Sequence, residues 1–162
     1  MTNTNTEMRR GFTMIELIFV IVIIGILAAV AIPKLAANRT DAQAAVCVHE
    51  AGQLLTEISG TYSKEGFSGF SGLNVSSMTN IRVGTAAAGQ NSVSDTAVHG
   101  ATTTYSCDGT AIVTFAGAVA GSDYNLTVGV PGAISTNPVA EKARAEFLEK
   151  TLQGATPKVF TL

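Results

Sequence analysis

The stretch GFTMIELIFVIVIIGILAAVAIP, which runs from Gly11 to Pro33, decides how this chain folds. Residues 17–32 carry no polar side-chain atom, and with their apolar neighbours they make a run of about 20 residues, enough to cross a bilayer as one helix. Glu16 is the one charge in this stretch, and a carboxylate in an apolar membrane segment points to a functional role. The basic pair Arg9 and Arg10 comes just before it, which favours a cytoplasmic position for this end.

Gly11, Phe12, Glu16, the apolar run and Pro33 together resemble the N-terminal signature of type IV pilins and of the pseudopilins of type II secretion. The resemblance covers residues 9–40. It implies that a prepilin peptidase cuts after Gly11, that the new amine of Phe12 is methylated, and that Glu16 guides assembly. Gly25 and Pro33 bracket a segment that is able to bend or unwind when subunits pack, since glycine weakens a helix and proline removes a backbone hydrogen bond.

The resemblance also implies partners and a location. The chain is expected to form a helical homo-oligomeric filament, after contact with the prepilin peptidase and with an assembly platform in the inner membrane. Before assembly it would be a single-pass inner-membrane protein with a periplasmic head, and afterwards part of a pilus or pseudopilus. Three functions stay open: a pilus subunit, a pseudopilin of a type II secretion or DNA-uptake system, and a membrane-anchored periplasmic binding module.

An ordinary secretory signal peptide is another interpretation of the same stretch. The basic pair would be its n-region, residues 17–28 its h-region, and Ala29-Val30-Ala31 its cleavage site. This interpretation leaves Glu16 unexplained, and it ignores the helical pattern that continues beyond Lys34. The prediction is therefore a leader at residues 1–11, a transmembrane and assembly helix at 12–33, and a head at 34–162.

The head is predicted to be α+β, with the second half of the long helix packed on a small antiparallel sheet. In residues 34–59 apolar side chains recur at helical spacing, and Gly60 is expected to end the helix. Residues 60–100 are rich in Gly, Ser, Thr and Ala, which indicates a loop region with at most a short strand or helix. Such a loop suits filament contacts or glycans, or has no specific task.

Residues 101–162 carry the sheet and a C-terminal helix. Asp108-Gly109 is a two-residue hairpin signal between strands at 101–107 and 110–115, and a third strand is expected at 124–130. Asn137-Pro138 is typical of a helix start, and that helix should end near Gln153. Residues 158–162 are expected to add an edge strand.

Cys47 lies on the apolar helix stripe, and Cys107 lies on a strand that should face it. In an exported head the two cysteines are permitted to pair, which would close a loop of about 60 residues and add about 4 kcal/mol of stability. Two buried free thiols are the alternative.

Nothing in the sequence indicates an enzyme, a metal or a cofactor. His49 and His99 have no neighbours at metal-ligand spacing, and Asp108 and Asp123 are more typical of turns than of a calcium site. With 14% charged residues and a net charge of −2, the chain has no general basic surface for nucleic acid, and no direct nucleic-acid binding is predicted. The mean hydropathy of +0.32 suits a protein that packs against its own copies.

Overall fold

The computed structural model describes residues 11–132 and 136–162. All of the predicted leader except Gly11, including the basic pair Arg9 and Arg10, lies outside the described residues. The chain divides into two compact units, one that ends at Asn38 and one that runs Arg39–Leu162 and is called the head from here on.

Helix α1 spans Met14–Phe70, 57 residues, and belongs to both units. Its first turn is capped by Thr13, whose side-chain oxygen accepts a hydrogen bond from the Glu16 N–H at 3.3 Å. The helix passes through Pro33, and Gly66 is the one position inside it where the backbone leaves helical dihedrals. An 18-residue window of α1 reaches a mean hydropathy of 3.1 with none of it buried, so by length and composition this helix is able to cross a membrane.

The prediction that Gly60 ends the helix is wrong, because α1 continues to Gly66 and resumes for one further turn up to Phe70. The apolar stripe explains the difference. It does not stop at Ile58 but extends to Tyr62, whose ring stacks on Tyr124 of the sheet with 4.7 Å between centroids. A glycine inside a helix costs only about 1 kcal/mol, less than burial of an aromatic side chain provides.

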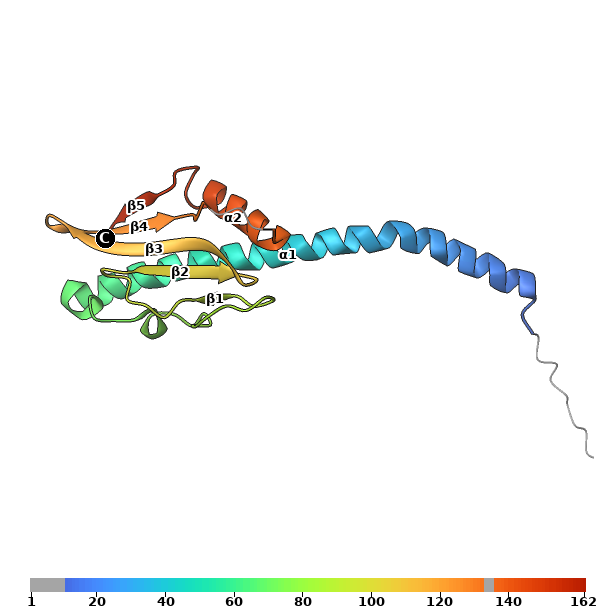
Figure 1. Cartoon of the computed structure of the whole chain (residues 1–162), viewed down its shortest axis with the longest axis horizontal. Coiled ribbons are helices and arrows are strands. Elements are labelled where there is room, and N and C mark those ends of the chain that lie inside the picture. The colour runs from blue at the N-terminus through green and yellow to red at the C-terminus, as the bar shows by residue number, and fades with distance from the viewer. Residues whose placement is uncertain (1–10, 133–135) are drawn as a thin grey trace, which may run out of the picture. The chain divides into compact units, whose positions relative to one another are not determined.

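In its described residues the head contains one antiparallel sheet of five strands in consecutive order (Figure 1). The strands are β1 Ser92–Val93, β2 Thr102–Cys107, β3 Thr110–Ala120, β4 Asp123–Gly129 and β5 Lys158–Thr161. Asp108 and Gly109 form the predicted two-residue turn with φ of 49° and 77°, the positive values that this tight hairpin needs. The three predicted strands and the edge strand are confirmed, and β3 is longer than expected because its next turn comes at Gly121, where φ is 67°.

The core lies between the sheet and the part of α1 in the head, which run side by side in Figure 1. The helix contributes residues of the predicted stripe to this core, namely Ala44, Cys47, Ala51, Leu54 and Ile58. Alternate residues of β2, β3 and β4 face them: Tyr105, Cys107, Val113, Phe115, Tyr124, Leu126 and Val128. The segment between α1 and β1 has one 3₁₀ turn, Val75–Ser77, and buries Val75 and Met78. The predicted loop region is thus anchored to the core.

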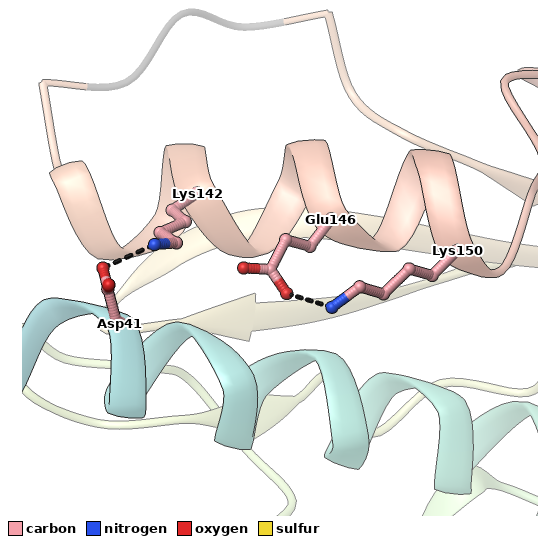
Figure 2. Close-up of polar contacts among 4 residues, drawn as sticks. All are labelled: Asp41, Lys142, Glu146 and Lys150. Carbon is pink, nitrogen blue, oxygen red and sulfur yellow. Dashed lines mark hydrogen bonds and ion pairs between the residues drawn. The ribbon is translucent and has the colours of Figure 1, made fainter. Parts of the chain in front are cut away.

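Helix α2 spans Pro138–Lys150 and closes another part of the core with Val139, Ala140, Ala143 and Phe147. The Asn137 side chain caps it as predicted, accepting hydrogen bonds from the N–H groups of Val139 and Ala140. Figure 2 shows how α2 lies along α1: Lys142 pairs with Asp41, and Lys150 pairs with Glu146 one turn away. Both pairs are exposed, so each adds at most about 1 kcal/mol.

Candidate assembly segment and the disulfide centre

Gly11, Phe12 and Thr13 precede α1 as non-helical, exposed backbone. A Cβ added at Gly11 would have no atom within 4 Å, and 85% of Phe12 is exposed. Both residues that flank the predicted cleavage site are therefore exposed. The predicted cleavage and methylation positions lie next to each other on an open segment.

Glu16 lies in the first turn of α1, where its carboxylate faces the positive end of the helix dipole. This placement lowers the cost of a charge at the edge of an apolar helix, and the Glu16 side chain is exposed. Gly25 and Pro33 lie farther along the same helix, and both are exposed as well. The five residues predicted for processing and assembly therefore share one short segment of the chain.

The large apolar side chains of this segment are exposed all round the helix. Their exposed fractions run from 42% at Ile23 to 85% at Phe12, and no residue from Gly11 to Arg39 is buried. Water does not stabilise a helix that is hydrophobic on every face. Lipid or other apolar helices are surroundings that suit such a surface.

The predicted disulfide is confirmed: Cys47 of α1 and Cys107 of β2 are joined, with 5.7 Å between their Cα atoms. Both residues are buried, and no free cysteine remains in the described part of the chain. The bond ties the helix to the hairpin end of the sheet across 60 residues of sequence.

A polar network surrounds this disulfide, and it starts at Glu50, one turn after Cys47. Its carboxylate accepts hydrogen bonds from the Tyr105 hydroxyl and from the Asn91 side chain. Burial of the ring, together with the bond to Glu50, raises the pKa of Tyr105 above its usual value. Asn91 in turn accepts a hydrogen bond from the Asp108 N–H at 3.0 Å. Glu50 and Asn91 therefore connect α1 to the β2–β3 turn.

Asp108 is a structural residue of this turn. Its carboxylate accepts hydrogen bonds from the Gly89 N–H and from the Asn137 side chain, the latter at 2.6 Å. A cavity of about 370 Å³ lies beside these groups, lined among others by Glu50, Asn91 and Asp108. In the described residues no group of three or more His, Cys, Asp or Glu side chains is placed to hold a metal ion.

The two histidines lie on α1 and in the loop that precedes β2. His49 is exposed on α1, and His99 lies against the rings of Phe67 and Tyr124 with centroid distances of 5.2 and 5.8 Å. Sequence reasoning missed both the network of Glu50, Asn91 and Tyr105 and this aromatic cluster. For the network, the one sequence feature that could have indicated it is the position of Glu50, three residues after Cys47 on the same helix.

Comparison with known proteins gives two findings. Residues 8–32 match the family model described as the prokaryotic N-terminal methylation motif. The chain is also similar to the type IV major fimbrial protein FimA of Dichelobacter nodosus, with 39% identity over 74 residues, which is 43% of this chain and 47% of that protein. The chain thus spans about half the length of this curated relative. No solved structure matches.

Proposed function

We propose that this chain is a structural subunit of a type IV pilus-like filament. The methylation motif and the similarity to a fimbrial protein support membership of the type IV pilin family. A prepilin peptidase would cut after Gly11, the amine of Phe12 would be methylated, and the subunits would polymerise through the N-terminal part of α1. One observation carries this proposal. The first half of α1 is apolar and exposed on every side, with Glu16 its only charge up to Pro33.

The apolar surface of this helix has to be covered both before assembly and after it. The bilayer provides the first, with the helix crossing the inner membrane once and the head in the periplasm. Packed helices of other copies provide the second, and an assembly platform in the inner membrane would move the subunits between the two. The disulfide of the head agrees with an exported compartment, because such bonds persist where the surroundings are oxidising.

Glu16 would set the register between copies. In the membrane its carboxylate lies near the interface, where water and headgroups lower the cost of the charge. In a filament core that solvation is lost, and an unpaired carboxylate becomes expensive. The Phe12 amine of a neighbouring subunit is the cation that the same segment supplies, and pairing with it would fix the axial stagger. Van der Waals packing between the apolar helices would provide most of the affinity.

Filaments sheared from cells and analysed by electron microscopy and mass spectrometry test the proposal. We expect long fibres that contain this chain, with an intact mass that starts at N-methyl-Phe12. A chain that starts at Met1 or Ile32 would contradict the processing step. Fibres that are absent while secretion or DNA uptake depends on the chain would favour a pseudopilin, and an unprocessed monodisperse protein would favour a membrane-anchored binding module.

The register step has its own test. Glu16→Ala should leave cleavage, membrane insertion and the folded head intact but reduce filament yield. Glu149→Ala removes an exposed carboxylate from α2 and serves as the matched control, for which normal filaments are expected. Normal filament yield and length in Glu16→Ala cells, at equal subunit levels, would refute the pairing mechanism.

A further inference from the structure

A pocket of about 180 Å³ opens on the head where the end of α1 meets the β3–β4 hairpin. Its lining combines aromatic and polar side chains: Tyr62, Phe67, Val119, Ser122, Asp123 and Tyr124. The volume is below the range of about 300–1,000 Å³ that holds drug-sized ligands. The pocket therefore suits a single small chemical group.

The aromatic walls of this pocket are held in place by their own contacts. Tyr62 and Tyr124 stack at 4.7 Å with 19° between their planes. Phe70 meets both rings edge-on at 5.4 Å, which fixes the pair from behind. Phe67 lies tilted to Tyr124 at 6.1 Å and is 43% exposed. Tyr124 and Phe70 are buried, so the accessible ring surface belongs to Phe67 and to the half-buried Tyr62. A ligand meets these two rings already oriented by the buried ones.

The polar rim consists of Ser122 and Asp123, at the turn of the hairpin. The Ser122 hydroxyl donates a hydrogen bond to the Asp123 carboxylate at 3.1 Å, which restrains that side chain. Asp123 is exposed, and among the described residues no Lys, Arg or His forms an ion pair with it. A negative charge at the rim of an aromatic pocket is therefore left without a cation from the head.

We propose that this pocket binds the ammonium group of a small organic cation. The faces of aromatic rings carry negative potential and attract cations, and proteins use this attraction to recognise quaternary ammonium groups. Asp123 adds a full negative charge on the open side, where the positive group would enter. A neutral ligand of the same shape would gain the apolar contact but neither electrostatic attraction. The site does not depend on filament assembly.

Choline is a suitable probe, and 3,3-dimethyl-1-butanol is its uncharged counterpart of nearly the same shape. The full chain, kept in a maltoside detergent, would be titrated with each compound while its tyrosine fluorescence is recorded. The chain has three tyrosines and no tryptophan, and two of the tyrosines line the pocket, so the signal reports mainly on this site. We expect saturable binding of choline in the millimolar range, weakened by salt, and at least about threefold weaker binding of the alcohol.

Two variants and a control localise the effect. Phe67→Leu keeps an apolar side chain but removes the ring, and Asp123→Asn removes the charge at constant size; each should weaken choline binding about three- to tenfold. Glu149→Gln makes the same charge change on α2 and should bind as the parent does. In the unaltered protein, choline should shift the NMR amide signals of Ser122 and Asp123, a measurement that does not depend on how a variant folds.

Several results would overturn the proposal. These are equal affinity for choline and the alcohol, choline shifts that lie away from the hairpin, or unchanged binding in both variants. Saturable binding of a neutral monosaccharide together with no response to choline would assign the pocket to sugars instead.

Discussion

Replacing Gly117 with alanine should be among the most damaging single-atom changes in the head. Gly117 lies on the core side of β3, and the Tyr124 ring leans across it from the neighbouring strand. A Cβ at this position would lie 1.9 Å from the Tyr124 hydroxyl oxygen and 2.6 Å from Cζ. Ordinary carbon contacts begin near 3.4 Å, so the ring would have to move by more than an ångström.

The ring has little room for that movement, because it is stacked on Tyr62 and flanked by Phe70. Overpacking of a well-packed core costs about 1–3 kcal/mol. Weakening of one or two aromatic pairs adds about 0.5–1.5 kcal/mol each. We therefore expect Gly117→Ala to lower the free energy of unfolding by about 2–4 kcal/mol.

Urea denaturation of the full chain in nonionic detergent, followed by tyrosine fluorescence, measures this change. Gly52→Ala is the matched control, because Gly52 lies inside α1 and an added Cβ has no atom within 4 Å. Helix propensity predicts that the control is more stable by about 0.5–1 kcal/mol. Tyr124→Leu should remove much of the clash, so the cost of Gly117→Ala should shrink in that background. A loss below about 0.5 kcal/mol, or strictly additive effects in the double variant, would refute this reasoning.

Three further predictions concern the same head. Cys107→Ser should cost about 2–5 kcal/mol in urea denaturation, since a closed loop of 60 residues is released, and the parent chain should resist alkylation until it is reduced. Gly60→Ala should raise the thermal midpoint, with about 0.5–1 kcal/mol gained, because Gly60 is helical with space around it; a fall would mean that the helix ends there. Burial raises the pKa of Tyr124 to about 12 and also raises that of Tyr105. Because each phenol holds its proton more tightly in the folded state, the part of the stability that these two tyrosines contribute should be constant below about pH 10. Above that pH it should fall by at most about 1.4 kcal/mol per pH unit per tyrosine, and the fall should be shallower in Tyr105→Phe.

Local signals in the sequence predicted the parts of the fold that local physics controls. Asp108-Gly109 forms its turn because few residue pairs accept positive φ at both positions, and Asn137-Pro138 starts α2 because an amide cap and a fixed φ favour a helix start. The disulfide followed from two periodicities. A helical period placed Cys47 on the buried stripe, and a strand period placed Cys107 on the face opposite it.

The end of α1 shows what those signals leave undecided. Gly60 and Gly66 are equally able to end a helix by their own chemistry, and a local rule selects the first one that follows the apolar stripe. The fold selects the second, because Tyr62 lies between them and its ring has a partner in Tyr124, 62 positions later in the chain. Tyr124 reaches that position only over a residue without a side chain, and β3 supplies Gly117 there. The helix end, the aromatic pocket and the close approach of Tyr124 to Gly117 are thus one long-range arrangement, and no window of neighbouring residues contains it.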